Sequence, residues 1–410
     1  MNFYLIAGEA SGDLHGANLM KALRLEDAEA HFRCWGGDLM QAAGGQLVKH
    51  YRTLAFMGFW EVARNIRTIS KNLDFCKKDL AAHRPDVLIL IDYSGFNLRI
   101  AKWAKLVGIR VFYYIAPQVW ASRQGRVAKI KAYVDRLFVI LPFEKAFYQQ
   151  HGMDVDFVGH PLLDAVAAFR EKHSLDNPSP NPLQRGKGSS VMGSVEANLD
   201  IEFPKNEFVI SMIAKPIIAL LPGSRRQEIS SVLIIMLSLV EQFSEYQFVI
   251  GVAPSISLDF YEKIITESGL KKSEVILLKN QTYALLNRAK AAIVTSGTAT
   301  LETALFEVPQ VVCYKGSWLT YQIAKRIIQV PYISLVNLIA NRSLVKELIQ
   351  NELTTTNLKK ELMEVLQPQK VVALKNAYRQ IKAELGEVGA SERTAKLMLK
   401  YLKATYHPSK

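Results

Sequence analysis

The stretch at residues 292–312, AIVTSGTATLETALFEVPQVV, most constrains the fold of this chain. It opens with apolar, β-branched residues, which are typical of a buried parallel strand. Three small residues, Ser296, Gly297 and Thr298, interrupt the run, and a helix is predicted from there to Pro309, which ends it. A second apolar run follows. This order of strand, turn, helix and strand predicts an α/β fold.

The turn at 296–298 suits a phosphate. A helix start offers free backbone N–H groups, and the hydroxyls and the glycine allow an anion to come close. Glu302 lies one turn into the predicted helix, where its carboxylate can accept hydrogen bonds from a sugar hydroxyl. Ser and Thr are also ordinary N-cap residues, so a capped turn without a ligand remains an alternative.

The length and the net charge of the chain limit its number of domains and the kind of partner it can bind. A chain of 410 residues is too long for one ordinary core, which predicts two domains. The 51 Lys and Arg against 38 Asp and Glu give a net charge of +13, which indicates an acidic partner such as nucleic acid, anionic lipid or a phosphorylated substrate. The apolar tract at 208–221 is interrupted by Lys215 and is shorter than the ~20 residues of a membrane span. Any membrane contact is therefore expected to be peripheral.

The three cysteines argue against a disulfide framework. Cys34, Cys76 and Cys313 lie far apart and have no metal-binding spacing. This usage fits a reducing cytosol.

Polar residues follow the first predicted strand, residues 2–7. The segment GEASGDLHGA has glycines, but their spacing differs from the dinucleotide-binding fingerprint. Glu9, Ser11, Gly12 and Asp13 would lie at the carboxyl end of that strand, where open α/β sheets bind ligands. A turn with helix caps is the alternative interpretation.

Asp92 ends a central apolar strand predicted at residues 86–92, DVLILID. An acid at the carboxyl end of a buried strand would face the ligand crevice, where a general base is needed. The alternative is that Asp92 caps the next helix, predicted at 96–105.

Two features could meet a lipid. Residues 54–60, LAFMGFW, are a run of large apolar side chains that continues into a helix with basic flanks. Such a helix can lie at a membrane interface or cover an acyl chain, or it can belong to the core. Between residues 99 and 136, nine Lys and Arg stand against one acid. This face suits RNA or a phosphate-bearing lipid, or it is simply solvated.

A stretch rich in Pro, Gly and Ser, 177–214, reads as a linker or flexible insertion. It predicts an N-terminal Rossmann-like domain, 1–176, a C-terminal domain, 215–385, and a helical tail, 386–410, that could pack back on the first domain.

The second predicted domain has two further candidate binding residues. In the segment GSRRQEI, Arg225 lies at a strand-to-helix turn, which suits contact with phosphate or carboxylate; a surface Arg pair with Arg226 is the alternative. Asn337 lies in an expected crevice loop, and Lys346 and Glu347 are predicted in the helix after it.

Eight sequence blocks, in the right order, together resemble the lipid-A-disaccharide synthase family, and the match spans nearly the whole chain apart from 177–214. The blocks are GEASGDLHGA at 8–17, ID and FN within 91–97, VWA at 119–121, LPFEKAFY at 141–148, GHP at 159–161, LPGSRRQEI at 221–229, SGTATLE at 296–302 and SLVNLIANRSLVKELIQ at 334–350.

The resemblance implies a GT-B type fold, in which two Rossmann-like doubly wound domains face a cleft. It implies an inverting glycosyltransferase that condenses UDP-2,3-diacylglucosamine with 2,3-diacylglucosamine 1-phosphate to lipid A disaccharide 1-phosphate and UDP. The family works at the inner membrane as a peripheral, cytoplasmic enzyme of lipid A biosynthesis, without a cofactor or a catalytic metal. No nucleic acid partner is implied, and a homo-oligomer is left open.

Within this family, Asp92 is expected to take the proton of the acceptor hydroxyl. Arg225 and the turn at 296–298 would bind the diphosphate of UDP, with Glu302 at the ribose and Asn337 nearby. The basic face at 99–136 would meet anionic lipid and the acceptor phosphate. Acyl or membrane contact is expected from the apolar residues Phe56, Met57, Phe59 and Trp60.

The chain departs from the family in two places. The family commonly has a second Asp just before FN, where this chain has Gly95, so the expected catalytic burden falls on Asp92. The segment 177–214 is longer than the family's usual connection. Two other hypotheses stay open at this point: another UDP-sugar enzyme of the same fold, either a soluble transferase or an epimerase, and an RNA-binding protein without a known RNA-binding motif.

Overall fold

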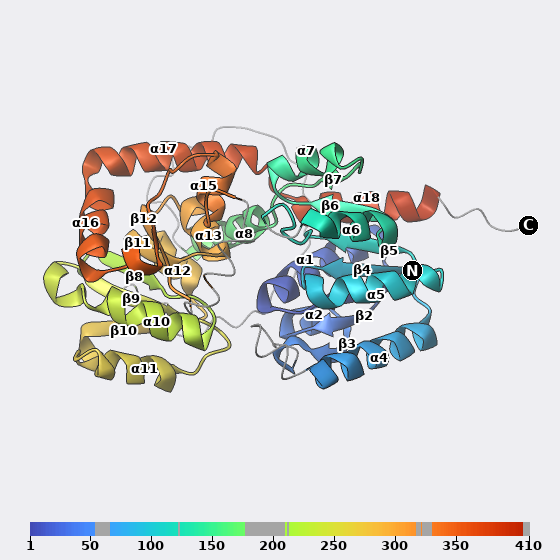
Figure 1. Ribbon diagram of the computed structural model, residues 1–410, viewed down its shortest axis with the longest axis horizontal. Coiled ribbons are helices and arrows are strands. Elements are labelled where there is room, and N and C mark those ends of the chain that lie inside the picture. Colours follow the sequence, from blue (N-terminus) through green and yellow to red (C-terminus); the bar gives the residue numbers. More distant parts are fainter. Residues whose placement is uncertain are drawn as a thin grey trace, which may run out of the picture. The chain divides into compact units, whose positions relative to one another are not determined.

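The computed structural model describes residues 1–53, 66–121, 124–176, 210, 213–316, 321 and 330–404. The chain divides into two compact units (Figure 1). Unit 1 holds the described residues of Met1–Asp164, Trp318–Pro331 and Gln380–Lys410, and unit 2 those of Ala165–Ser317 and Tyr332–Arg379. Each unit is an α/β layer structure built on its own parallel sheet.

The sheet of unit 1 reverses its strand order in the middle. All its neighbouring strands are parallel, and Ala7 at the end of β1 pairs with Ile91 at the end of β4. Strands β2 and β3 lie on one side of β1, and strands β4 to β7 lie on the other. In spatial order the strands are β3 (Gln46–His50), β2 (His31–Gly36), β1 (Asn2–Ala7), β4 (Val87–Ile91), β5 (Val111–Tyr114), β6 (Arg136–Val139) and β7 (Asp156–Phe157).

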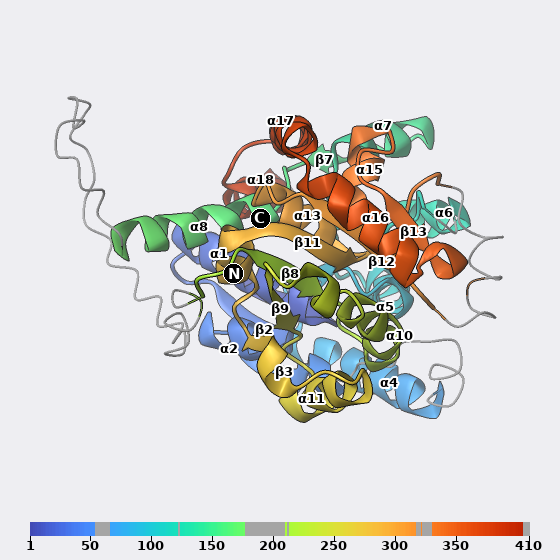
Figure 2. The same cartoon turned by 90° about the vertical axis from the view of Figure 1, so that its left-hand side faces the viewer.

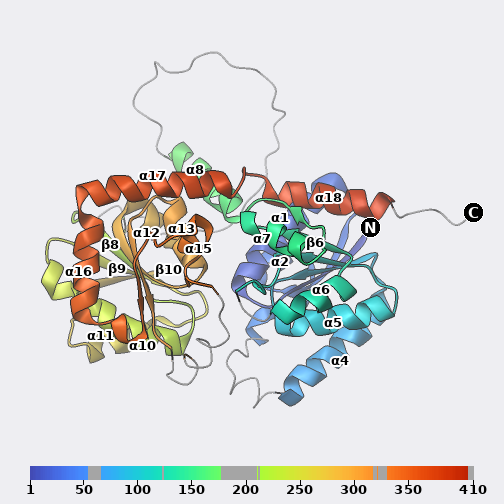
Figure 3. The same cartoon turned by 45° about the horizontal axis from the view of Figure 1, so that its top comes forward.

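Helices cover the sheet of unit 1, so the side chains of β4, VLILI, are all buried. Helix α1 contacts α2 and α18, while α5 contacts α4 and α6 (Figure 3). The helices of this unit are α1 (Ala10–Glu26), α2 (Asp38–Ala42), α4 (Ile66–His83), α5 (Ser94–Leu106), α6 (Val127–Tyr133), α7 (Pro142–Gln150) and α18 (Ala390–Ala404), with the short 3₁₀ helices η1 (Tyr51–Thr53) and η2 (Gln124–Arg126).

The sheet of unit 2 has the same kind of reversal, here between β8 and β11 (Figure 2). Its neighbouring strands are parallel, and Leu221 at the end of β8 pairs with Val294 near the end of β11. In spatial order the strands are β10 (Val275–Lys279), β9 (Gln247–Val252), β8 (Ile217–Leu221), β11 (Ala289–Thr295), β12 (Gln310–Tyr314) and β13 (Glu347–Ile349).

Helices also pack against this second sheet: α10 contacts α11 and α16, and α13 contacts α15. The helices are α10 (Arg226–Leu237), α11 (Leu258–Glu267), α12 (Thr282–Arg288), α13 (Thr298–Leu305), α15 (Leu335–Ala340), α16 (Thr355–Leu366) and α17 (Pro368–Glu384), with η4 (Val240–Phe243), η5 (Lys272–Glu274) and η6 (Gln350–Glu352).

Helix α8 (Leu162–Asp176) contributes to both units. Its first residues belong to unit 1, where Asp164 caps the start of α18 by accepting from the backbone N–H groups of Gly389, Ala390 and Ser391. From Ala165 onward the helix belongs to unit 2. This division falls earlier than the boundary expected after residue 176, because the middle of the helix packs on unit 2.

The contacts of α8 with unit 2 are polar and aromatic. Arg170 donates from Nη2 to the Leu305 carbonyl at 3.0 Å, and Phe169 meets Tyr283 and Phe306 edge to face. The C-terminal segment from Gln380 groups with unit 1, where α18 packs on α1.

The expected helix containing Lys346 and Glu347 is wrong, because Glu347 opens strand β13, which pairs with β12. Three consecutive β residues at a sheet edge leave little periodicity to detect in the sequence. No helix in the described part of the chain has the length and apolarity to cross a bilayer.

Candidate functional site

Each sheet brings polar turns together at the point where its strand order reverses. Such switch points bind ligands in open α/β sheets, because the turns on either side lead away in opposite directions and leave a crevice. In unit 2, residues 222–225 follow β8 and residues 296–298 follow β11. In unit 1, Glu9 follows β1 and Asp92 follows β4. Glu9, Asp92, Arg225 and the turn at 296–298 thus lie at two switch points, one in each unit.

The turn after β11 is open to an anion. Gly297 precedes the first residue of α13 and has a φ of 153°, where a side chain would be strained. A Cβ placed there would meet no atom within 4 Å. Gly297 and Thr298 are exposed, and the first N–H groups of a helix have no partner within it. These N–H groups therefore stand at a free surface, with the positive end of the helix dipole behind them.

Ser296 has a different role from its neighbours in this turn. Its backbone N–H donates to the Cys313 carbonyl at 3.0 Å, and its hydroxyl donates to the Ile333 carbonyl at 2.7 Å. With both donors committed inside the protein, Ser296 can offer a ligand only oxygen lone pairs. Phosphate oxygens need donors, so the N–H groups of Gly297 and Thr298 suit a phosphate better than the Ser296 hydroxyl does.

The turn after β8 is shaped by a glycine and a carboxylate. Gly223 has a φ of 105°, and a Cβ there would lie 2.3 Å from Oε2 of Glu228. Glu228 accepts from the Ser224 backbone N–H at 3.4 Å. Burial raises the pKa of Glu228, and the charge of Arg225 opposes this rise. Arg225, at the start of α10, is therefore electrostatically coupled to the turn.

Arg225 and its neighbour Arg226 differ in their surroundings. Arg226 lies over the Phe260 ring, 4.7 Å from its centroid. Arg225 is exposed, and its charge acts on Tyr314 at the end of β12 as well as on Glu228. Of the two, Arg225 is the one associated with the switch point.

Glu302 and Tyr283 form a half-buried pair beside the open turn. The Tyr283 hydroxyl, at the start of α12, donates to Oε1 of Glu302 at 3.3 Å. Burial raises the pKa of Glu302 to about 7, and the hydrogen bond from Tyr283 opposes this rise. Phe169 and Phe306 pack around Tyr283. Near neutral pH, Glu302 can thus change between accepting and donating hydrogen bonds.

Asn337 is buried, with no exposed surface. Its Nδ2 donates to the Val345 carbonyl and to Glu347 Oε1, both at 2.9 Å, and its Oδ1 accepts from the N–H groups of Leu344 and Val345. Two donors and two acceptor bonds use the whole capacity of an amide. The side chain therefore holds its own segment together, which is a structural role rather than ligand contact.

Asp92 has an unusual backbone. Its φ is 43°, that of Tyr93 is 48° and that of Ile115 is 64°, so three non-glycine residues of this region are left-handed. The carbonyl of Asp92 accepts from Asn97 Nδ2 at 2.8 Å and from the Tyr113 hydroxyl. Each such conformation costs about 1–3 kcal/mol and persists where its surroundings enforce it. These two hydrogen bonds thus fix the backbone of Asp92, and with it the position from which the side chain extends.

The carboxyl of Asp92 has a raised pKa. It reaches solvent, yet the desolvating effect of the protein around it, together with the negative charge of Glu9, raises its pKa to about 6. A carboxylate with a pKa close to neutrality is a stronger base than an ordinary Asp and remains ionised at pH 7. The Tyr93 ring lies over Gly8, where a Cβ would approach its atoms to 2.3 Å.

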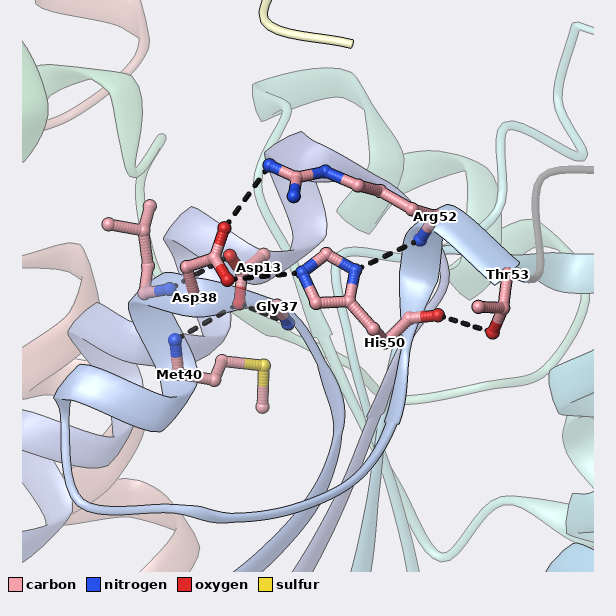
Figure 4. Close-up of polar contacts among 8 residues, drawn as sticks. Asp13, Gly37, Asp38, Met40, His50, Arg52 and Thr53 are labelled. Atoms are coloured by element: carbon pink, nitrogen blue, oxygen red, sulfur yellow. Dashed lines mark hydrogen bonds and ion pairs between the residues drawn. The ribbon is translucent and has the colours of Figure 1, made fainter.

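The other residues expected near Glu9 have mainly structural surroundings. The buried Asp13 carboxylate accepts from the N–H groups of Gly37, Leu39 and Met40 at 2.7–3.1 Å and caps α2 (Figure 4). Gly12 lies so close to β1 that a Cβ would come within 3.1 Å of the Ala7 side chain. Ser11, in the first turn of α1, is exposed.

A second polar cluster flanks this cap, at the end of β3 (Figure 4). His50 Nε2 lies 3.3 Å from Asp38 Oδ1, and Arg52 reaches Asp38 Oδ2 at 3.2 Å. The Arg52 backbone N–H donates to His50 Nδ1, and Thr53 Oγ1 to the His50 carbonyl. Sequence analysis did not single out these residues.

Of the two features expected to face a lipid, the structure describes most of the basic stretch but not the apolar run. Phe56, Met57, Phe59 and Trp60 lie outside the described residues. In the basic stretch, Leu106 and Val107 at the end of α5 are 75% and 52% exposed. The exposed basic residues of α5 and α6 are Arg99, Lys102, Lys105, Lys129 and Lys131.

No three His, Cys, Asp or Glu side chains come together in the described ranges in a way that could hold a metal ion.

Comparison with known proteins identifies the family. The family model described as lipid-A-disaccharide synthetase matches residues 3–178 and 194–400. The lipid-A-disaccharide synthase of Syntrophus aciditrophicus is 38% identical over 404 residues, which is 97% of this chain and 97% of that protein.

Solved structures agree with the fold. The Staphylococcus aureus MnaA–UDP structure has a TM-score of 0.66 at 12% identity and covers 100% of this chain and 99% of that one. The Methanocaldococcus jannaschii UDP-GlcNAc 2-epimerase, in complex with UDP-GlcNAc and UDP, has a TM-score of 0.63 at 13% identity, with coverage of 98% and 100%. They confirm the expected GT-B type α/β fold. The chain belongs to the lipid-A-disaccharide synthetase family, the glycosyltransferases of lipid A biosynthesis.

Proposed function

We propose that this protein transfers the sugar of UDP-2,3-diacylglucosamine to a hydroxyl of 2,3-diacylglucosamine 1-phosphate, which gives lipid A disaccharide 1-phosphate and UDP. The observation that carries the proposal is the division of chemistry between the two switch points. The one in unit 2 offers donors and positive charge, and the one in unit 1 offers a carboxylate with a raised pKa. Family membership supplies the reaction class.

Unit 2 would bind UDP. The diphosphate would accept hydrogen bonds from the N–H groups of Gly297 and Thr298 and from the guanidinium of Arg225, which can donate two parallel bonds. Glu302 would accept hydrogen bonds from the ribose hydroxyls. Two solved structures of similar fold carry UDP, which supports a nucleotide site in this architecture. The same positive groups would stabilise the charge that develops on UDP as it leaves.

Unit 1 would activate the acceptor. Asp92 would accept the proton of the attacking hydroxyl while the new carbon–oxygen bond forms and the bond from the sugar to UDP breaks. Attack from the face opposite the leaving group inverts the anomeric centre. A pKa of about 6 leaves the carboxylate ionised at neutral pH, as a general base requires.

Peripheral contact with an anionic membrane surface is part of the proposal. The exposed cations on α5 and α6 and the exposed Leu106 and Val107 form one stretch of chain that combines charge with apolar surface. Cations near anionic lipid contribute about 1 kcal/mol each. The apolar residues Phe56, Met57, Phe59 and Trp60 would add acyl or bilayer contacts. Vesicles with and without anionic lipid would test this, since binding should need the anionic lipid and weaken with salt.

The deciding experiment is incubation with both acylated substrates in detergent, followed by mass analysis of the product. We expect the disaccharide 1-phosphate and one UDP per product, with both formed far more slowly by the Asp92→Asn variant. A soluble transferase or an epimerase of the same fold would instead act on a UDP-sugar without acyl chains. Turnover of UDP-GlcNAc with no product from the acylated pair would therefore overturn the proposal.

A further inference from the structure

The carboxylate of Glu347 accepts hydrogen bonds from four donor groups. It is the first residue of β13, at the edge of the sheet of unit 2. It accepts from the backbone N–H groups of Ile333 and Ser334 at 3.0 and 2.9 Å, from Ser334 Oγ at 2.7 Å and from Asn337 Nδ2 at 2.9 Å. Charge-assisted bonds of this kind are about twice as strong as neutral ones.

The segment that Glu347 holds touches the open turn after β11. The carbonyl of Ile333, whose N–H is bound to Glu347, accepts the hydroxyl proton of Ser296 at 2.7 Å. Ser296 is also tied through its N–H to the Cys313 carbonyl. A continuous path of hydrogen bonds therefore runs from Glu347 through Ile333 to the residue that precedes Gly297.

The charge of Glu347 does not serve the ligand directly. A carboxylate in the unit that binds a diphosphate can only repel that ligand, and the repulsion grows as the dielectric constant falls. The role of Glu347 is instead to provide two carboxylate oxygens that accept hydrogen bonds from Ile333, Ser334 and Asn337. Buried Ser334 and Asn337 would otherwise carry unsatisfied donors, which cost about 1–3 kcal/mol each.

We propose that Glu347 is a positioning residue for the diphosphate subsite. By holding Ile333, it keeps Ser296 in one conformation, so that the N–H groups of Gly297 and Thr298 stay aimed at the same point. The inference rests on the proposed function in one respect, namely that a diphosphate is the ligand of this turn.

The test compares four proteins by titration with UDP and by thermal unfolding. In Glu347→Gln, one oxygen becomes an NH₂ that faces donors, so we expect the Kd for UDP to rise roughly 10-fold. Glu347→Asp keeps the charge and should recover part of the loss. The matched control is Glu352→Gln in η6, since Glu352 is exposed and pairs with Lys346 at 3.5 Å.

A double variant separates positioning from simple structural support. If Glu347 acts through Ser296, the effect of Glu347→Gln on the Kd should be much smaller in a Ser296→Ala background than in the wild type. Full additivity would overturn the inference. So would an unchanged Kd, with or without a lower Tm, in Glu347→Gln. If the wild type itself fails to bind UDP, the proposed function fails first, which is a different result.

Discussion

Asn97 donates a hydrogen bond from Nδ2 to the main-chain carbonyl of Asp92 at 2.8 Å. Asn97 is fully buried, and the same nitrogen lies 3.3 Å from the Ile91 carbonyl at the end of β4. Asp92 is in the left-handed region, which a non-glycine residue enters only when neighbouring groups compensate for the strain. The proposed base is thus held through its backbone, from the interior of α5, while its carboxyl stays at the surface.

This relationship predicts that Asn97→Ala lowers kcat without weakening UDP binding. Without the amide, the Asp92 backbone can relax, and a displacement of about 1 Å can cost roughly 100-fold in rate. The measurement is kcat with the acylated pair beside the Kd for UDP. Tyr113→Phe, which removes the other donor to the same carbonyl, should give a smaller loss in the same direction. A wild-type kcat in both variants would contradict the holding role.

Asp92→Asn should slow transfer strongly and leave UDP binding intact. Loss of a general base typically costs roughly 10²–10⁴-fold. In the wild type, only the ionised carboxylate can take the proton, so kcat/KM should fall as the pH drops through about 6. Near-normal turnover in the variant, or a flat profile from pH 5 to 8, would remove Asp92 as the base.

The same pKa predicts an effect on stability. Because folding raises the pKa of Asp92 from an unfolded value of about 3.9, the fold favours the neutral form. Its contribution is therefore present below pH ~4 and is lost as the pH rises through about 6. Asparagine cannot ionise, so at pH 7.5 the variant should unfold at the same temperature as the wild type or a higher one. A clearly lower Tm would mean that the ionised carboxylate is stabilising.

Sequence patterns located the polar turns that lie at the two switch points, and the reason is physical. Buried parallel strands have to be apolar on both faces, so β1, β4, β8 and β11 stand out as runs that end in polar turns. Asp92 and the turn at 296–298 could be singled out because they follow such runs directly. The pairing of β1 with β4, which brings Glu9 and Asp92 to neighbouring strand ends, joins segments far apart in the sequence and is not encoded in any local pattern.

The partners of individual side chains could not be predicted. Asp13 and Asp92 both lie at or near the ends of strands in unit 1, but Asp13 caps α2 from a distance in sequence that no local pattern encodes. Asn337 has the composition of a ligand contact, yet its amide is used within its own segment. The role of Glu347 could not be predicted either, because β13 is too short to show a period.

Glu302 should make UDP-sugar binding dependent on pH. The ionised carboxylate accepts hydrogen bonds from ribose hydroxyls and the neutral form accepts them poorly, so affinity should rise as the pH increases through about 7. A UDP-sugar is the suitable probe, because its diphosphate does not titrate in this range. Calorimetry at pH 6 and 8 should show the change in the wild type. In Glu302→Gln, binding should be roughly 10-fold weaker and independent of pH. An identical pH dependence in the variant would assign it to another group.

Gly95→Asp tests whether Asp92 is the only carboxylate that this enzyme needs for catalysis. Gly95 lies in the first turn of α5 and is exposed, and a Cβ added there would meet no atom within 4 Å, so the larger residue fits. Replacing a helical glycine stabilises by up to about 1 kcal/mol, and an acid near a helix N-terminus adds about 0.3–1 kcal/mol. If Asp92 alone is the base, Gly95→Asp and Gly95→Ala should both have a higher Tm than the wild type, and kcat should be unchanged in both. A several-fold rise in kcat specific to the Asp variant would instead show that a second acid at position 95 contributes to catalysis.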